Sequence, residues 1–147
     1  MPTIREQIIQ AAVSAVNANR PDDVPECTRT KLEPTENGSL PALTCFPYRE
    51  IVTSTKPGGR WGPTVDRVLY LRFVAQAQGK PADASADPIL AWLTKALGGQ
   101  TFNGLTDDTQ ESEITYSYDE GTFQVVSVAQ DFKIEYQTLR ADATAIN

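Results

Sequence analysis

The chain has 147 residues, of which 40% are hydrophobic, and a chain of this length buries about 68–70% of the surface that it exposes when unfolded. We therefore expect a single domain over residues 1–147. The formal net charge is −6 and the lysines and arginines are scattered, which disfavours nucleic-acid binding. No window approaches the roughly 20 apolar residues of a membrane-spanning helix, and the N-terminus lacks the apolar core of a signal peptide, so we expect a soluble protein with no membrane partner.

The composition offers little for catalysis, because the chain contains no histidine, which is the commonest general base and metal ligand. Adjacent acidic pairs fall in predicted turns, where such residues favour caps and tight bends. They are Asp22-Asp23, Asp107-Asp108 and Asp119-Glu120. Cys27 and Cys45 have no CxxC companion, so we interpret them as buried small apolar side chains, with a disulfide between them left open. We expect neither an enzyme nor a metal or other cofactor.

The first predicted element is an amphipathic helix. Thr3 and Glu6 have the spacing of a capping box, in which the threonine hydroxyl and the glutamate carboxylate each accept a hydrogen bond from a free backbone N–H. Apolar residues then recur at helical spacing from Ile4 to Val16. The helix should end before Pro21, which lacks a backbone donor and restricts the residue in front of it.

After this helix the composition is that of a connection, in which the alternating piece Cys27–Leu32 could form an edge strand. Leu43–Phe46 and Glu50–Ser54 have the composition of strands. Because Pro47 cannot donate to a ladder of hydrogen bonds, we expect either two short strands or one bent strand here.

The segment Lys56–Pro63 contains three glycines and two prolines, which predict a loop. It also carries the cations Lys56 and Arg60 and the aromatic Trp61. A phosphate-binding loop is excluded, because the GK[ST] pattern is missing. Two interpretations stay open, a mobile hairpin tip or a contact loop in which Trp61 anchors a partner.

A strand is predicted over Asp66–Gln76, followed by a flexible segment at Gly79–Ser85. Asp87 then has the position of an N-cap, and proline follows it at the first helical position, so the second helix is expected at Pro88–Leu97. This helix is apolar over most of its surface, including Trp92, which is typical either of core packing or of a subunit interface.

The remaining elements are a strand at Glu111–Tyr118, a hairpin turn and a long strand at Thr122–Gln137. At about 3.3 Å per residue the last strand would span roughly 50 Å, so either a bulge divides it or part of it extends beyond its own sheet. Gln130 interrupts the apolar alternation, and we expect the bulge there. A projecting end would offer unpaired N–H and C=O groups to a neighbouring subunit. The tail Arg140–Asn147 is polar and is expected to be loosely held.

In this order the elements predict an α+β fold, with a mainly antiparallel mixed sheet of about five strands and two main helices packed on it. The whole series resembles the tail terminator, or tail-completion, proteins of long-tailed bacteriophages. The resemblance covers nearly the full length and lies in the order and spacing of the elements. It rests on the segments TIREQIIQAAVSAV, LPAL, DRVLYLRFVAQAQG, SADPILAWLTKAL and VVSVAQDFKIEYQTLRADA.

The resemblance implies a structural virion protein that assembles as a hexameric ring on the finished tail tube, stops tube growth and presents a joining surface to the head. The implied partners are further copies of the chain, the tail tube protein and head–tail connector proteins, while genomic DNA passes through without specific binding. The family has no catalytic residue to transfer. From this chain we predict a tube or connector contact at Lys56, Arg60 and Trp61, and a subunit interface at Trp92, Phe132, Ile134 and Tyr136.

Three other interpretations of the sequence stay open. The nearest is another ring or adaptor protein of the phage neck, which belongs to the same class. A small ligand-binding or enzymatic module on the same core is the second, and it would be a stable monomer with a ligand-dependent melting temperature. A toxin, immunity or accessory protein with a different partner is the third.

Overall fold

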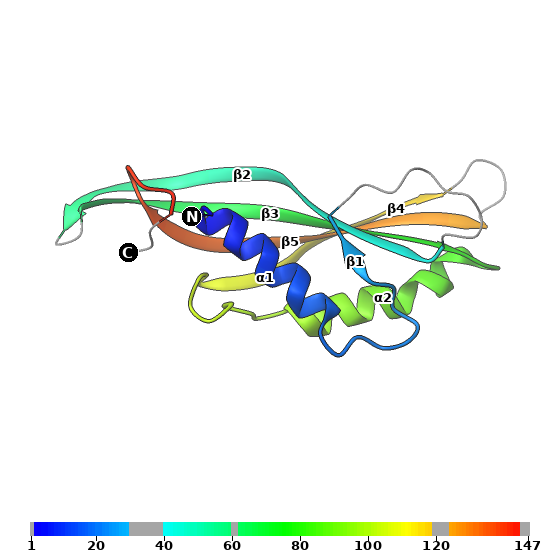
Figure 1. The fold of residues 1–147 in the computed structure, drawn as a ribbon. Helices are drawn as coiled ribbons and strands as arrows, with labels where there is room; N and C mark the ends of the chain where they lie inside the picture. The colour runs from blue at the N-terminus through cyan, green and yellow to red at the C-terminus, as the bar shows by residue number, and fades with distance from the viewer. Residues whose placement is uncertain (1, 30–39, 60–61, 119–123, 145–147) are drawn as a thin grey trace.

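The computed structural model describes residues 2–29, 40–59, 62–118 and 124–144. In these residues two helices and five strands follow one another as α1 (Ile4–Asn17), β1 (Cys27–Thr28), β2 (Ala42–Gly59), β3 (Gly62–Gln78), α2 (Ala82–Leu97), β4 (Asp108–Tyr118) and β5 (Val125–Leu139) (Figure 1). The predicted α+β fold is confirmed. Neither helix of the described chain has the length and apolarity needed to cross a membrane.

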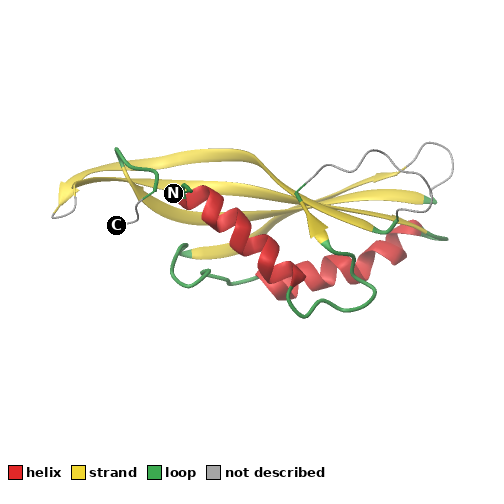
Figure 2. Cartoon of the chain, viewed as in Figure 1, coloured by secondary structure: helices red, strands yellow, loops and turns green. Residues whose placement is uncertain are grey.

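The strands form one mixed sheet in the order β1-β2-β3-β5-β4. β1 is parallel to β2, and the other three pairings are antiparallel. Both helices lie against the same face of this sheet, which we call the helix face (Figure 2). In the described residues no helix covers the opposite face, which we call the open face.

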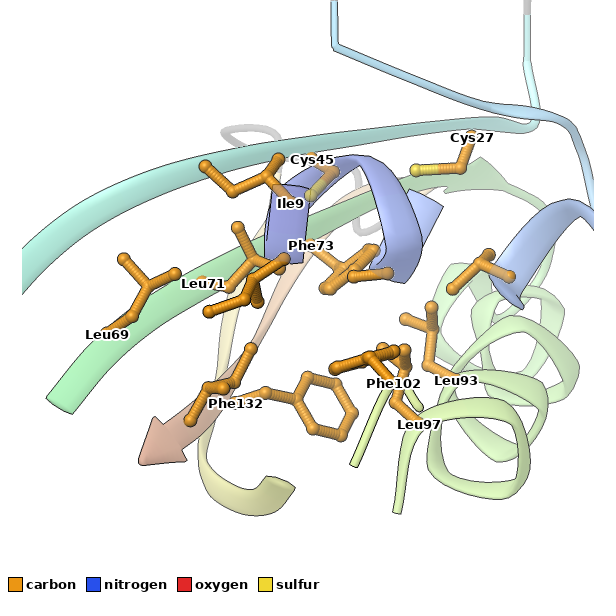
Figure 3. Close-up of a cluster of buried hydrophobic side chains, with 14 of the residues drawn as sticks. Ile9, Cys27, Cys45, Leu69, Leu71, Phe73, Leu93, Leu97, Phe102 and Phe132 are labelled. Atoms are coloured by element: carbon orange, nitrogen blue, oxygen red, sulfur yellow. The ribbon is translucent and has the colours of Figure 1, made fainter. Parts of the chain in front are cut away.

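The main core lies between the helix face and the two helices (Figure 3). Leu71 and Phe73 point into it from β3, as the period-2 geometry of a strand requires. Phe73 meets Phe132 of β5 edge to face, with the ring centroids 5.8 Å apart. Ile8 of α1 and Leu93 of α2 belong to the same buried cluster. A smaller cluster packs the first turns of α2 against the start of β5.

Of the two hydrogen bonds predicted for the capping box of α1, the one to the Thr3 hydroxyl is confirmed. Thr3 Oγ1 accepts a hydrogen bond from the Glu6 backbone N–H at 3.1 Å, whereas the Glu6 carboxylate pairs with Arg29 Nη1 at 2.5 Å. The helix ends at Asn17, before the proline as predicted. The Asn17 side chain then holds β1, because its Oδ1 accepts from Cys27 N–H at 2.8 Å and its Nδ2 donates to the Cys27 carbonyl at 3.0 Å.

The start of α2 differs from the prediction. The helix begins at Ala82, with Pro81 at the N-cap position, and Pro88 lies inside it. The expectation of a flexible segment followed by a helix from Pro88 was therefore wrong. Ala82 and Ala86 are fully buried against the start of β5. We attribute the extra turns to this packing, which offsets the missing backbone donor of Pro88 and the steric clash of its ring with the preceding turn.

β5 is neither divided nor projecting. It stays in one register with β3 over its full length, since β3 is the longer strand, with 17 residues against 15. No bulge occurs at Gln130, and the irregularity lies in β4 between Glu111 and Glu113. The Gln130 side chain is fully buried, and its Nε2 donates to Thr94 Oγ1 at 3.1 Å and to Glu111 Oε1 at 3.0 Å. Polar partners therefore satisfy the amide nitrogen of Gln130 without a bulge, while its buried Oε1 accepts no hydrogen bond from the described residues.

β2 is one bent strand, which is one of the two predicted possibilities. Its pairing with β3 is irregular between Pro47 and Arg49, as expected for a proline in a ladder. The strand continues to Gly59, so the loop predicted at Lys56–Pro63 is mostly β-structure. β1 is shorter than the predicted Cys27–Leu32, and residues 30–32 of that prediction lie outside the described residues.

The C-terminal segment is tied to the rest of the chain up to Thr144. The Arg140 N–H donates to the Pro63 carbonyl at 2.8 Å, and the Ala143 carbonyl accepts from the Ile4 N–H at 2.9 Å. Asp142 forms an isolated bridge with Leu139. The expectation of a loosely held tail is therefore wrong for residues 140–144, while residues 145–147 lie outside the described residues.

Candidate assembly surfaces

β2 and β3 continue together as a hairpin beyond the N-terminal end of α1 (Figure 1). We call residues 52–59 and 62–67 the hairpin arm. Asp66 of β3 links the arm to both neighbouring strands, since it accepts hydrogen bonds from Ser54 Oγ of β2 at 2.6 Å and from Gln137 Nε2 of β5 at 2.7 Å. These two hydrogen bonds lower the pKa of the Asp66 carboxyl. The arm is therefore braced by polar contacts on its surface.

The predicted contact loop falls on the end of this arm. Lys56 lies in β2, and its Nζ is 3.3 Å from the Asp66 carboxylate. Such an exposed ion pair contributes little to stability, about 0–1 kcal/mol. Arg60 and Trp61 lie outside the described residues. A contact with a tube or connector through these residues stays a prediction.

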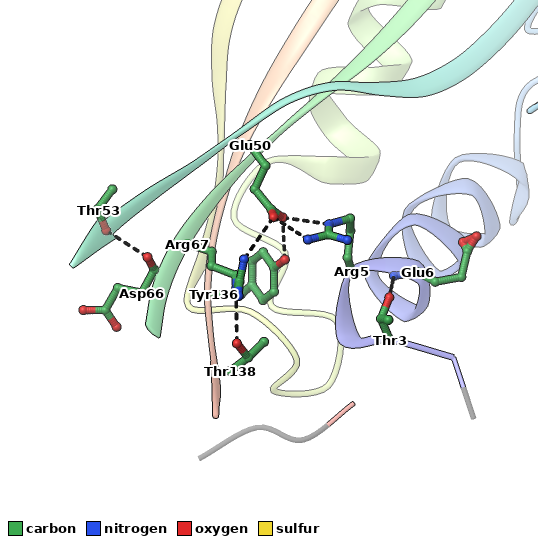
Figure 4. A network of polar contacts seen from close by, with 9 residues as sticks. All are labelled: Thr3, Arg5, Glu6, Glu50, Thr53, Asp66, Arg67, Tyr136 and Thr138. Carbon is green, nitrogen blue, oxygen red and sulfur yellow. Dashed lines mark hydrogen bonds and ion pairs between the residues drawn. The ribbon is translucent and has the colours of Figure 1, made fainter. Parts of the chain in front are cut away.

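A polar network fastens the root of the arm to α1 (Figure 4). The Glu50 carboxylate of β2 accepts from Arg5 Nε at 3.0 Å, from Arg5 Nη2 at 2.5 Å and from Tyr136 Oη at 2.5 Å. Arg67 Nη1 of β3 reaches the same carboxylate at 3.3 Å, while its Nε donates to Thr138 at 3.1 Å. One carboxylate thus joins α1, β2, β3 and β5.

The charges of this network are fixed by its geometry. Burial alone would raise the pKa of Glu50, but the hydrogen bonds from Arg5 and Tyr136, together with the charge of Arg67, hold it below its usual value. The hydrogen bond to Glu50 raises the pKa of Arg5, and burial followed by the same carboxylate raises the pKa of Tyr136. At neutral pH the Glu50 carboxylate is ionised and accepts hydrogen bonds from the two arginines and the tyrosine hydroxyl. This arrangement holds the helix and the strands together.

Three of the predicted subunit contacts lie in the core. Phe132, Ile134 and Tyr136 are almost completely buried on the helix face. Because β5 does not extend beyond its sheet, the residue-level reason for placing a neighbour here is lost, and these side chains are not available at the surface. The surface for another copy must be sought elsewhere.

Trp92 joins the two helices. Its indole Nε1 donates to the Val16 carbonyl at 2.8 Å, and its ring packs against the main core. This contact agrees with the core-packing interpretation of α2. A subunit contact through Trp92 stays a prediction.

Large apolar side chains are exposed at both edges of the sheet, where the sequence analysis did not place an interface. They are Phe46, Tyr48 and Val52 on β2 and Ile114, Tyr116 and Tyr118 on β4. The alternation in β4 predicts a half-buried strand, but this strand lies at the end of the sheet order, and its row of side chains is not buried under α2. Only the strand order could have revealed that this row is exposed.

Rings and guanidinium groups cover the middle of the open face. Arg72 donates to Asp131 through two hydrogen bonds of 2.8 and 3.0 Å, and its guanidinium carbon lies 4.2 Å from the centre of the Tyr48 ring. Asp131 is fully buried beneath this pair. Arg49 similarly lies over the Tyr70 ring, at 5.2 Å from its centre. Aromatic and cationic groups therefore cover the middle of a face on which no helix of the described chain lies.

The acidic and cysteine side chains of the described residues do not gather into a metal site. These residues contain no group of three or more cysteine or acidic side chains placed to hold a metal ion. A cleft of about 530 Å³ at the root of the arm is lined by side chains of both charge signs. Asp22 and Asp23 lie in a turn and Asp108 begins β4, whereas Asp119 and Glu120 lie outside the described residues.

The two cysteines are buried free thiols on neighbouring strands, as the simpler interpretation predicts. The hydrogen bond with Cys27 and burial raise the pKa of the Cys45 thiol. A protonated, buried thiol is a poor nucleophile and a poor metal ligand. Cys45 is therefore unreactive at neutral pH.

Comparison with known proteins gives a fold likeness. No protein family and no curated protein matches the sequence. Among solved structures, the chain is similar to a chain of the virion of a native gene transfer agent particle, with a TM-score of 0.55 and 12% sequence identity over 92% of each chain. At this identity the likeness shows a shared fold, and the α+β fold of this chain is therefore one that a virion chain also adopts.

Proposed function

We propose that this chain is a structural protein of a tailed-phage virion. In this role it caps the tail tube as a hexameric ring, stops tube polymerisation and forms the surface to which the head is joined. Its partners are further copies of itself, the tail tube protein and the head–tail connector. It works in the virion after assembly in the host cytoplasm, and it needs neither a catalytic residue nor a cofactor.

The observation that carries the proposal is the fold likeness to a virion chain, which extends over 92% of both chains. The resemblance of the sequence to tail terminators gives the role within the virion. The surface of the single chain supports an assembling protein, because large apolar side chains are exposed on β2 and β4 and isolated soluble chains rarely expose such groups in rows.

The charge of the chain supports the same role. DNA must pass through a ring at this place, and each phosphate that a protein neutralises adds affinity through counterion release. A net charge of −6 keeps that affinity low. The ring would therefore let DNA move through its channel without holding it.

The proposal is tested by adding the purified chain to tail tube protein during polymerisation. We expect shorter tubes as the ratio of chain to tube protein rises, because each bound ring blocks a growing end. Bovine serum albumin at the same concentration is the control for crowding. Tubes of unchanged length that carry the protein would indicate a ring elsewhere in the neck, and unchanged tubes without bound protein would contradict the proposal.

A further inference from the structure

Two exposed apolar patches lie on opposite sides of the strand order, one on β4, the last strand, and one on β2 beyond the two residues that pair with β1. The β4 patch consists of Ile114, Tyr116 and Tyr118, which are 41%, 47% and 38% exposed. Their partners in β5 are buried under α2, so this patch belongs to the helix face. The two tyrosine rings are stacked, with centroids 6.5 Å apart and planes within 12°. The two rings and Ile114 therefore lie in a row along one face of β4.

The β2 patch consists of Phe46, Tyr48 and Arg49. Phe46 pairs with Arg72 and Arg49 pairs with Tyr70, both of which point to the open face. The rings of Phe46 and Tyr48 are each 38% exposed. The two patches therefore face opposite sides of the same sheet, one at each edge.

The two patches differ in their charged groups. Glu111 is on the same face of β4 as the exposed rings, and the acidic Asp83 of α2 lies close enough to Tyr118 to act on its hydroxyl. The β2 patch instead contains Arg49, for which the described residues show a ring contact with Tyr70 and no ion pair. Two carboxylates also act on the Tyr48 hydroxyl of this patch, namely Asp131, which is paired with Arg72, and Glu113 of β4. Arg49 is therefore the group of the β2 patch that would complement Glu111 and Asp83 of a neighbouring copy.

The backbone edges also differ. β2 carries Pro47 and Pro57, and its pairing with β3 is irregular beside both, so this edge is poorly suited to receive another strand. β4 has eleven residues without a proline, lysine or arginine, and in the described residues no strand covers its outer edge. Because only β4 is suited to strand pairing, a contact between β4 of one copy and β2 of another would be made by side chains.

We propose that the β4 patch of one copy docks on the β2 patch of the next copy. This inference rests on the proposed function, because it names the contact that would close the ring. A ring contact is heterologous, so the β4 patch of one copy must meet a different patch on its neighbour, and the β2 patch is the second exposed apolar patch of the described chain. A two-fold contact between two β4 strands would instead place Glu111 and Asp83 of both copies together.

Cross-linking tests the contact directly. A chain that carries both Phe46→Cys and Ile114→Cys is mixed with tail tubes and treated with a short bifunctional maleimide, and the products are separated in denaturing gels. We expect a ladder of oligomers from the double variant and monomers from each single variant and from the wild type, whose two thiols are buried. A dimer from Ile114→Cys alone would show a two-fold contact and would overturn the inference.

Two matched substitutions distinguish an effect on the β4 patch from a general effect of an added arginine on strand β4. Tyr116→Arg places a cation opposite the proposed position of Arg49, whereas Ser117→Arg places it on the other face of the same exposed strand. In chains that also carry the two cysteines, we expect Tyr116→Arg to lower the cross-linked fraction about tenfold or more, which is the effect of losing a hot-spot residue at the centre of an interface. Ser117→Arg should leave it unchanged, and equal effects would contradict the inference.

The outcomes also distinguish this inference from the proposed function. If the double variant caps tubes but gives no ladder, the contact between the patches is wrong and the capping role stands. If a ladder forms in solution while tubes stay uncapped, the contact stands and the capping role fails.

Discussion

Glu50 adds a polar attachment of α1 to the one that the core provides, because its carboxylate contacts Arg5 of α1 as well as Arg67 and Tyr136 of the sheet. Its pKa is lower in the folded chain than in the unfolded chain. The group therefore stabilises the fold at pH values above the ordinary glutamate pKa of about 4.3, and this contribution is lost as the pH falls through the folded pKa.

We predict that Glu50→Gln lowers the free energy of unfolding at pH 7 by about 1.5–3 kcal/mol, the usual effect of losing hydrogen bonds to a charged group. The difference from the wild type should shrink as the pH falls below about 4.3. Urea unfolding at a series of pH values measures both effects. Glu26→Gln, at an exposed position, is the control, and a difference that does not change with pH would contradict the assignment.

Phe132 and Tyr116 test whether the aromatic residues are correctly divided between core and surface. Phe132 is fully buried against Phe73, and we predict that Phe132→Ala lowers the free energy of unfolding by about 3–5 kcal/mol. Tyr116 is 47% exposed, and Tyr116→Ala should change it by no more than about 0.5 kcal/mol. Denaturant unfolding of both variants measures the contrast. Similar losses in the two variants would mean that Tyr116 also belongs to the core of the single chain.

At the level of single residues, local chemistry was readable from the sequence and tertiary partners were not. Thr3 could be predicted as a cap because its acceptor and the Glu6 N–H are three residues apart. Gln130 could not be interpreted, since its partners Thr94 and Glu111 come from two other elements. The same holds for Glu50, whose role depends on residues of α1, β3 and β5.

The hairpin arm is the element that we propose to meet the tube or the connector. Thr55 and Val65 are directly paired across it, so residues 56–64 can be replaced by Asn-Gly, the sequence preferred in two-residue hairpin turns. We predict that this shortened chain keeps its fold and loses binding to tail tubes in a co-sedimentation assay. Lys56→Gln in the full-length arm is the milder companion, and it tests whether the charge of this lysine contributes.

The control for the shortened arm is its thermal unfolding, which should stay within a few degrees of the wild type, since a loss of about 1 kcal/mol corresponds to about 2–8 °C in domains of this size range. Tube binding that survives the deletion would remove the arm from the contact. It would leave the other assembly surfaces on β2 and β4 as the places to examine.

At the level of elements, the existence and type of nearly every helix and strand could be predicted, whereas their ends could not. The local signal of Asp87 followed by Pro88 favours a helix start there, but burial of Ala82 and Ala86 extends the helix by more than a turn. The length of β5 invited a projecting end, but β3 matches it along the full length. The end of a strand depends on the strand that pairs with it, and the apolar periodicity of the sequence does not identify that neighbouring strand.

At the scale of the whole molecule, sequence order alone was sufficient to predict the class of fold, and the fold likeness to a virion chain agrees with it. The candidate surfaces were less accessible to prediction. Which face of a strand is exposed depends on the strand order and on the side to which the helices pack. The predicted contacts Phe132 and Ile134 are buried for this reason, while Ile114 and Tyr116 are exposed at the edge.

The most direct test of the proposed role is electron microscopy of the purified chain mixed with isolated tail tubes that lack their head-proximal cap. The proposal predicts one ring of density at the head-proximal end of each tube and none along its wall or at the distal tip. Density distributed along the wall, rings at the distal end, or bare tubes at saturating protein would contradict it.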